Sequence, residues 1–281
     1  MRTRRRAAII VASAAALGVG LFAFTGSASA LTFCNPPAPN ATQGNQSCVN
    51  GSITPNTGLG GGARKNISLF THVATKYLNP GNRSEGGFAK QVTVLYDSDG
   101  TINALPQGTA PKTHRCTVAM VSNKTIPQAY AACGPNGTDA YVSPVGTVSG
   151  KASTAPPSNF GACTLIFQGK DASHVTLYTR VFTVPNSNPS CTVSNGGGNV
   201  TVVLEGTVAN AGVAGFGKKL VTPLPSGITL PLDDFWAVVK RGNYVTSNCI
   251  GGTSKIRGIF VYSSSVHPYE TDTSNSSQPC T

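Results

Sequence analysis

Charged residues, tryptophan and methionine are scarce in this sequence, and amphipathic helices are missing from it. Only 11% of the 281 residues are charged, and there are one tryptophan and two methionines. No window of eleven or more residues keeps apolar side chains at the 3.6-residue period of a helix that packs on a core. This absence excludes helical bundles and parallel α/β folds, because both are built from such helices.

Catalytic and metal-binding motifs are also absent. The four histidines have no nucleophile pattern around them, and the sequence has no G-x-S-x-G segment. The C-x2-C and H-x3-H spacings that are typical of zinc sites do not occur either. We therefore predict no catalytic residue, no metal site and no bound cofactor.

Residues 97–100, Asp-Ser-Asp-Gly, allow two interpretations. Some calcium-binding loops present their oxygens on an Asp-x-Asp-Gly step, but the remaining ligands of such a loop are missing here. Asp-Gly after an apolar strand is also a strong hairpin signal, in which the glycine adopts a positive φ. We favour the hairpin turn.

The first thirty residues are typical of an export signal. They contain an arginine-rich start, an apolar run over residues 7–24 and small residues at 28–30. Their arginines leave the general secretory and twin-arginine routes both open. No second apolar stretch of eighteen residues follows, so no transmembrane segment is expected after signal removal. We expect a secreted, extracellular protein that begins near Leu31.

Eight cysteines follow this signal, and an even number of cysteines in an exported protein predicts disulfides. Spacing alone does not fix their connectivity. The simplest scheme joins neighbours in the sequence: Cys34 with Cys48, Cys116 with Cys133, Cys163 with Cys191, and Cys249 with Cys280. The last pair would fix a polar tail, residues 263–279, which has too few apolar side chains to dock by burial.

The chain is basic, which predicts contacts with anionic polymers. Its net charge is +11, and it becomes +7 after signal removal because four of the 21 Lys and Arg leave and none of the ten acids does. Such a surplus attracts anionic cell-wall polymers through salt-sensitive contacts and favours association with the cell wall. The basic residues are scattered, so no specific nucleic-acid site is expected.

Glycine and proline are abundant, at 32 and 19 residues, and they separate short runs of β-branched and aromatic side chains. In the clearest run, residues 200–209, Val202, Leu204 and Val208 share one face of a half-buried strand. Further strands are predicted at 65–76, 91–96, 115–122, 163–168, 175–184, 217–223, 235–240 and 255–262. The pattern predicts an all-β fold: a disulfide-linked antiparallel β-sandwich, immunoglobulin-like or jelly-roll-like.

Three stretches are too rich in turn residues to predict strands, namely 35–62, 146–159 and 186–199. We accordingly divide the chain into a signal peptide at 1–30, a Gly/Pro/Asn-rich, disulfide-stapled arm at 31–62 and a β-sandwich domain at 63–281. A boundary within that domain has its best candidate near 146–162.

Asp233, Asp234, Trp236 and Arg241 form the candidate surface site. Paired carboxylates divide acid and base work in glycosidases, and tryptophan stacks on sugar rings. Adjacent residues of a strand point to opposite faces, however, so the two carboxylates would diverge. A strand that buries Phe235 or Trp236 in the core is therefore the favoured interpretation.

The last third of the chain contains a series of glycines, prolines and aromatics: Phe216-Gly217, Leu224-Pro225, Leu230-Pro231-Leu232, Asp234-Phe235, Tyr244-Val245, Gly258 with Phe260 and Tyr262, and Gln278-Pro279-Cys280. In this series it resembles a group of exported, uncharacterised actinobacterial proteins that end in a strand-rich domain with a terminal cysteine. A fainter resemblance extends back to about Cys133, and residues 31–115 lie outside it. The resemblance implies an all-β extracellular domain and no assigned activity.

These observations lead to one main expectation and two alternatives. We expect a non-catalytic structural or binding module at or near the cell envelope, with anionic cell-wall polymers or glycans as partners. The first alternative is an extracellular polysaccharide hydrolase with a site near Asp233, Asp234 and Trp236, which needs two carboxylates within about 5 to 10 Å. The second is a secreted inhibitor or toxin-like binder that uses the segment 35–62.

Overall fold

The computed structural model describes residues 33–39, 44–77, 88–102, 116–133, 146–153, 159–171, 173–182, 200–224, 232–239, 244–263 and 271–281. Most ordered elements in these residues are strands. The strands are β1 (Gln46–Thr54), β2 (Lys65–Asn66), β3 (Ser68–Lys76), β4 (Phe88–Asp97), β5 (Gly100–Ile102), β6 (Gly146–Ser153), β7 (Asn159–Gln168), β8 (His174–Phe182), β9 (Val200–Val213), β10 (Phe216–Pro223), β11 (Leu232–Val239), β12 (Val245–Ser247), β13 (Thr253–Ser263) and β14 (Thr271–Pro279). The helices are α2 (Val118–Val121) and α3 (Ile126–Cys133).

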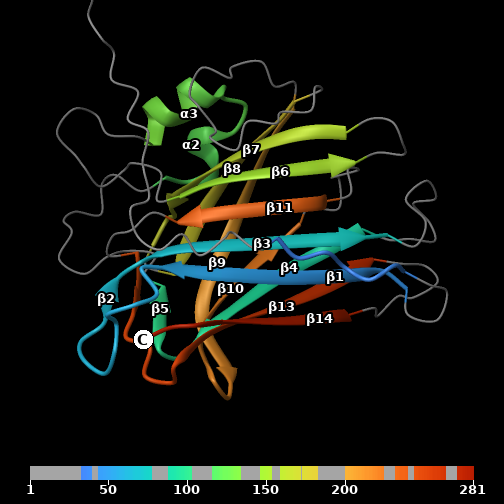
Figure 1. Cartoon of the computed structure of the whole chain (residues 1–281). Coiled ribbons are helices and arrows are strands. Elements are labelled where there is room, and N and C mark those ends of the chain that lie inside the picture. The colour runs from blue at the N-terminus through green and yellow to red at the C-terminus, as the bar shows by residue number, and fades with distance from the viewer. Residues whose placement is uncertain are drawn as a thin grey trace, which may run out of the picture.

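Eleven of these strands form one antiparallel sheet, in the order β1-β3-β11-β6-β7-β8-β9-β10-β4-β13-β14. The sheet turns back on itself, so that β9, β10 and β4 cross behind β11, β3 and β1 (Figure 1). The strands β2, β12 and β5 form a small second sheet. The result is a two-layered, sandwich-like antiparallel structure with disulfides, which confirms the predicted fold class.

Apolar side chains fill the space between the two layers. One buried cluster joins β1, β3, β4 and β13 and includes Val49 and Phe260. A second joins β7, β8 and β9 and includes Ile166 and Val208. Leu204 packs against this second cluster, so the predicted inward face of β9 is confirmed.

The two edge strands of the sheet, β1 and β14, meet through side chains. Each strand runs antiparallel to its neighbours, and an odd number of strands makes the first and the last run in the same direction. Three main-chain N–H groups of β1 donate to side chains of β14: Ser47 to the Asp272 carboxylate, Val49 to Ser274 Oγ at 2.9 Å and Ile53 to Gln278 Oε1 at 2.7 Å. The donors and the acceptors advance in equal steps, as two strands of the same direction require.

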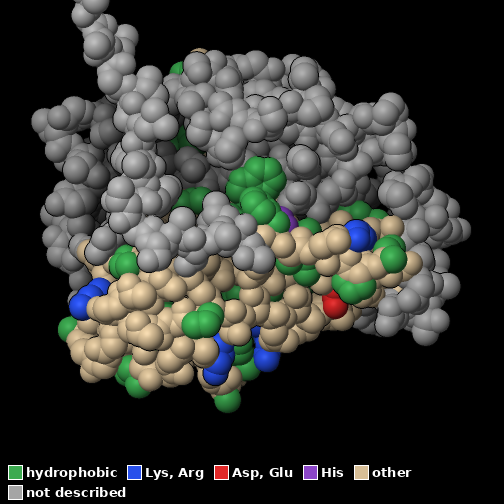
Figure 2. All heavy atoms as spheres, viewed as in Figure 1, with side chains coloured by type: hydrophobic (Ala, Val, Ile, Leu, Met, Phe, Trp, Pro, Cys, Tyr) green, Lys and Arg blue, Asp and Glu red, His purple; other side chains and the backbone are tan. Residues whose placement is uncertain are grey.

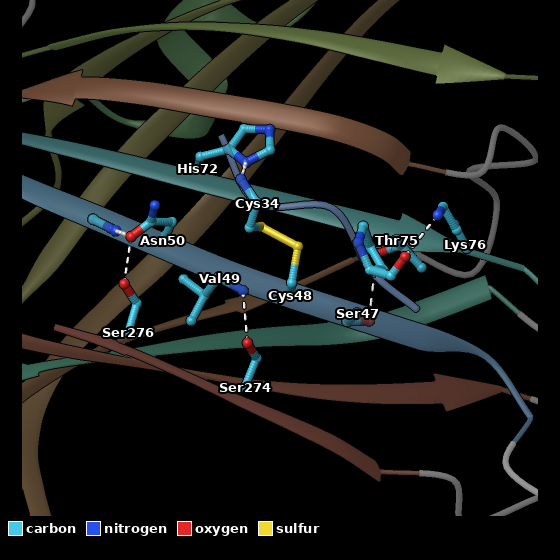
Figure 3. Close-up of a disulfide and its surroundings, with 12 residues drawn as sticks. Cys34, Ser47, Cys48, Val49, Asn50, His72, Thr75, Lys76, Ser274 and Ser276 are labelled. Atoms are coloured by element: carbon cyan, nitrogen blue, oxygen red, sulfur yellow. Dashed lines mark hydrogen bonds between the residues drawn. A yellow bond between two sulfur atoms is a disulfide. The ribbon is translucent and has the colours of Figure 1, made fainter. Parts of the chain in front are cut away.

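The remaining N–H group of this row is also satisfied. Gly51 N–H donates to Asn50 Oδ1 at 2.8 Å, and Ser276 Oγ hydrogen-bonds the same oxygen (Figure 3). Every second N–H group from residue 47 to residue 53 therefore has an acceptor. An edge strand that is covered in this way no longer offers free donors to another chain.

Two short helices cover the outer face of β7 and β8. Leu165, Phe167 and Tyr178 pack against the helices, whereas Ile166 points between the layers. The expectation of a strand at 115–122 is wrong, because Val118 and Val121 lie one helical turn apart in α2 and Val121 packs into the helix-covered cluster. No helix in the described residues is long and apolar enough to cross a membrane.

The start of α3 has a capping box that the sequence analysis missed. Thr125 N–H donates to Gln128 Oε1 at 3.0 Å, and Gln128 N–H donates to Thr125 Oγ1 at 3.4 Å. Pro127 in the first turn needs no intrahelical N–H bond, so it is compatible with a helix start. Thr-Ile-Pro-Gln at 125–128 was therefore a readable helix signal.

Three of the four predicted disulfides are present. Cys34–Cys48, Cys116–Cys133 and Cys249–Cys280 have Cα–Cα distances of 6.0, 5.3 and 6.0 Å. These distances are ordinary for disulfides. Cys191 and the side chain of Cys163 lie outside the described residues, so the fourth pair stays a prediction.

Composition misled the sequence analysis at three strands. β1 lies within the turn-rich stretch 35–62, β6 lies within 146–159 and β14 lies within the polar tail. In β1, a Cβ on Gly51 would come within 2.8 Å of Ile256 Cδ1, so this glycine allows close packing instead of a turn. In β14, polar side chains are the groups that bind the neighbouring edge. The stretch 186–199 lies outside the described residues.

Candidate functional site

Three ring side chains form a row on the outer face of β3 and β11. His72 and Trp236 lie opposite each other in the register of the two strands. Phe70 lies two residues before His72 on β3, and therefore on the same face. Phe235 packs against the clusters between the layers, so the alternation of the strand turns Trp236 outward. Of Phe235 and Trp236, one of which was expected to face the core, Phe235 is therefore the inward residue.

A segment before β1 crosses this row and is fixed to it at several points. The disulfide Cys34–Cys48 ties it to β1, and Cys34 N–H donates to His72 Nδ1 at 3.0 Å (Figure 3). Further along the segment, Lys76 Nζ donates a hydrogen bond of 2.6 Å to Pro36 O. Because His72 Nδ1 accepts a hydrogen bond, that nitrogen carries no proton.

The ring of Phe33, at the start of this segment, stands nearly perpendicular to all three rings of the row. Its centroid lies 4.8 Å from His72, 5.7 Å from Phe70 and 5.9 Å from Trp236, with interplanar angles of 79°, 82° and 86°. Edge-to-face arrangements of this kind are favourable for aromatic rings. His72 is only 2% exposed, whereas Phe33 is 52% exposed and Trp236 is half-buried. We call Phe33 and Trp236 the aromatic surface.

The structure does not place the other residues of the predicted surface site. Asp233 and Asp234 lie in β11 with Trp236, but the positions of their side chains are outside the described part of the chain. Arg241 lies outside it altogether. Sequence analysis missed Phe33, because the residue precedes the sheet, and the one signal for it is a large aromatic residue next to Cys34.

A cluster of charged side chains joins the β7–β8 turn to β9. His174 Nδ1 lies 2.5 Å from Asp171 Oδ1, and His174 Nε2 lies 3.7 Å from Glu205 Oε1. Lys170 Nζ also contacts Glu205, at 2.7 Å. The hydrogen bond from His174 is the main reason that the pKa of Asp171 is lowered. Both ring nitrogens face carboxylates, so this histidine is not arranged to activate a nucleophile.

The Asp-Ser-Asp-Gly segment forms a tight turn between β4 and β5, as predicted, but the two strands belong to different sheets and do not pair, so the predicted hairpin is wrong. Asp97 Oδ1 accepts from Asp99 N–H at 2.8 Å, and Asp97 Oδ2 accepts from Lys255 N–H at 2.9 Å. Main-chain donors thus use the oxygens that calcium would need. Gly100 is not among the glycines with positive φ, so that detail of the prediction is wrong. In the described residues, no group of three or more His, Cys, Asp or Glu side chains is arranged so that it could hold a metal ion.

A small cavity lies beside this connection, and it is lined by residues that include Ile53, Tyr96, Asp97 and Ile256. Its volume of about 30 Å³ has room for one or two water molecules and for no organic substrate. Burial raises the pKa of Tyr96, and a hydrogen bond with the Thr71 side chain opposes this rise in part. The cavity is thus unsuitable as a binding pocket.

The aromatic surface is therefore the best candidate for a ligand contact in the described part of the chain. It combines exposed ring area with a rigid support, whereas the two carboxylate clusters are occupied by internal partners. No family model matches this chain, and no curated protein or solved structure is significantly similar to it.

Proposed function

We propose that this is a secreted, non-catalytic binding module of the cell envelope, which binds glycans on the aromatic surface. The single observation that carries the proposal is the position of Trp236: it lies on the outer face of the sheet, next to the 52% exposed ring of Phe33. Aromatic faces bind sugar rings because they bury the apolar C–H face of the sugar while its hydroxyls stay in water.

Rigidity supports the same role. Trp236 is held in a central strand between β3 and β6, and Phe33 is held by the disulfide of the adjacent Cys34. Rings that are already ordered lose little conformational entropy when a ligand binds, so more of the contact energy appears as affinity. A flexible arm would lack this advantage.

The disulfides and the charge support a location outside the cytoplasm. Disulfides persist mainly in oxidising compartments, and the chain contains three in its described part. The surplus of basic side chains favours retention near anionic cell-wall polymers, as an addition to the glycan contact. Specific recognition would then come from the rings and general retention from the charges.

The test is sedimentation with chitin, cellulose and purified bacterial cell wall, with protein recovered from the culture medium of an expressing host. We expect Trp236→Ala and Phe33→Ala each to lower the affinity for the bound polymer about tenfold, in variants that stay folded at the assay temperature. Met120→Ala is the matched control, because Met120 is a 37% exposed apolar residue on α2, away from the aromatic surface.

Two outcomes would contradict the proposal. One is a parent protein that sediments with none of the three polymers, or Trp236 and Phe33 variants that bind as well as the parent. The other is release of reducing sugar from a polymer, which would support the polysaccharide hydrolase alternative.

A further inference from the structure

One end of the molecule gathers the turns that join β4 to β5, β9 to β10 and β12 to β13. The β9–β10 hairpin extends to the lower edge of the molecule in the view of Figure 1. β9 pairs with β8 only as far as Thr207, opposite His174, and then continues for six residues to Val213. At about 3.3 Å per residue, the hairpin projects about 20 Å beyond the β7–β8 turn.

Two of the exposed large apolar side chains lie on these turns. Val213 is 37% exposed on the β9–β10 hairpin, and Ile250 is 68% exposed on the β12–β13 turn. Gly212, Gly215 and Gly252 have positive φ and allow these tight turns. We call residues 212–215 and 250–252 the tip surface.

The Asp-Ser-Asp-Gly connection ties both parts of the tip surface to one rigid unit. Ser98 N–H donates to Gly215 O at 3.1 Å, on the β9–β10 hairpin. Gly251 N–H donates to Asp99 Oδ2 at 2.7 Å, on the β12–β13 turn. The two apolar tips are therefore fixed relative to each other instead of moving as separate loops.

Basic side chains surround the tip surface. Six of them belong to this end and to the adjoining outer face: Arg64, Lys65, Lys218, Lys219, Lys255 and Arg257. Several donate to uncharged oxygens: Arg64 to Ser98 O at 3.1 Å, Lys65 to Gly58 O at 2.5 Å and Lys218 to Asn210 Oδ1 at 2.8 Å. Their charge is thus not cancelled by these bonds. In Figure 2 hydrophobic and Lys/Arg side chains lie side by side along the lower edge.

The acidic side chains described at this end are Asp97 and Asp99, and both accept main-chain N–H groups. Six basic against two acidic side chains leave this end positive. Residues 208–217, which include the turn of the hairpin, contain no charged side chain, and Lys218 and Lys219 follow directly, opposite Asn210 and Ala209. The combination is an apolar, uncharged tip inside a positive rim.

We propose that the tip surface docks on the surface of an anionic lipid membrane. Val213 and Ile250 enter the boundary between headgroups and acyl chains, and the rim contacts the anionic headgroups. A hydrated polyanion such as a teichoic acid would attract the rim equally but would gain nothing from exposed Val213 and Ile250. The tips therefore favour a lipid surface as the partner. This site is separate from the aromatic surface and does not depend on the glycan proposal.

Vesicle sedimentation tests the proposal, with the protein recovered from culture medium as above. We expect binding to vesicles that contain phosphatidylglycerol, weak binding to pure phosphatidylcholine, and release of the protein at high salt. Ile250→Asp and Val213→Asp should each lower the affinity about tenfold, because each places a charge where an apolar side chain was buried. Met120→Asp, at a site on α2 that is as exposed as Val213, is the matched control and should bind like the parent.

The rim is tested by a second pair of variants. Lys255→Gln should weaken binding to anionic vesicles severalfold, whereas Lys90→Gln, at the opposite end of β4, should not. Intact melting temperatures and the absence of free thiols show that each variant is folded.

Three results would overturn the proposal. The parent protein fails to bind anionic vesicles; Ile250→Asp binds them as the parent does; or soluble polyphosphate competes fully while the tip variants stay unaffected. The last result would indicate a polyanion partner instead of a membrane.

Discussion

The helical cover on β7 and β8 and the terminal strand β14 are both tied by disulfides, but opposite kinds of contact hold them to the sheet. The helices dock by burial: Phe167 is 1% exposed and Tyr178 is 0% exposed beneath them. β14 pairs with β13 along its main chain and meets β1 by polarity, with oxygens of Ser274 and Gln278 on the main chain of β1. One contact removes apolar area from water, and the other supplies acceptors to an edge strand.

This difference shows that a strand without apolar side chains can cover the edge of a sheet in an all-β chain. The side chains of β14 alternate between exposed and half-buried, and the half-buried set, which includes Asp272 and Ser276, is polar throughout. Each polar contact is modest on its own because folding exchanges it for a bond to water. The order of β14 then depends on its pairing with β13, on the whole row of contacts with β1 and on Cys249–Cys280.

The largest effect is expected where apolar burial holds the contact. Phe167→Ala should lower the free energy of unfolding by about 3 to 5 kcal/mol, since it leaves a cavity between β7 and the helices. Urea unfolding measures the change. Phe33→Ala is the matched control and should cost much less, because that ring is 52% exposed. If the two variants lose equal stability, the helices do not dock by burial.

A smaller effect is expected at the polar seam. Ser274→Ala should cost about 1 to 2 kcal/mol, because it leaves Val49 N–H without its acceptor. Ser277→Ala removes the same hydroxyl from the exposed face of the same strand and should cost almost nothing. Urea unfolding of the two variants gives the comparison. Equal values would mean that the seam does not hold β14, and that its pairing with β13 and the disulfide do.

The smallest effect is expected at the exposed contact between Asp171 and His174. The pKa of Asp171 is lowered in the folded state, so the carboxylate stabilises the fold above about pH 4 and loses this effect as the pH falls through its folded pKa. Asp171 is 45% exposed, so water screens the contact and its contribution stays below about 1 kcal/mol. Asp171→Asn should therefore be slightly less stable than the parent at pH 7, and the difference should shrink as the pH falls below about 4. A difference that does not change with pH would argue against the electrostatic origin.

The sequence predicted most strands because they follow a local rule. Runs such as 200–209 and 255–262 alternate apolar and polar side chains, and this alternation survives wherever one face of a strand is buried. The rule fails for β14, since none of its residues is apolar except the proline at its end. It also fails at α3, where Thr125 and Gln128 form a capping box in a segment without a long helical period.

The candidate site was predictable only in part. Trp236 was singled out because it is the only tryptophan, but its direction depends on the register of β11 between β3 and β6. Phe33 reaches the same surface from more than two hundred residues away in the sequence. No local pattern records such a distance, and the tip surface is likewise assembled from two separate turns, which a third turn ties together.

The sequence by itself determined that this chain is an all-β, disulfide-linked protein, and it indicated three neighbouring cysteine pairs correctly. These features depend on composition, on alternation and on short loops, all of which are local. Only the tertiary structure decided which face of β11 points outward, how the polar strand β14 covers the edge of β1, and which turns meet at the tip surface. Those outcomes depend on strand order and register, which arise when distant segments pair, and no single segment contains that information.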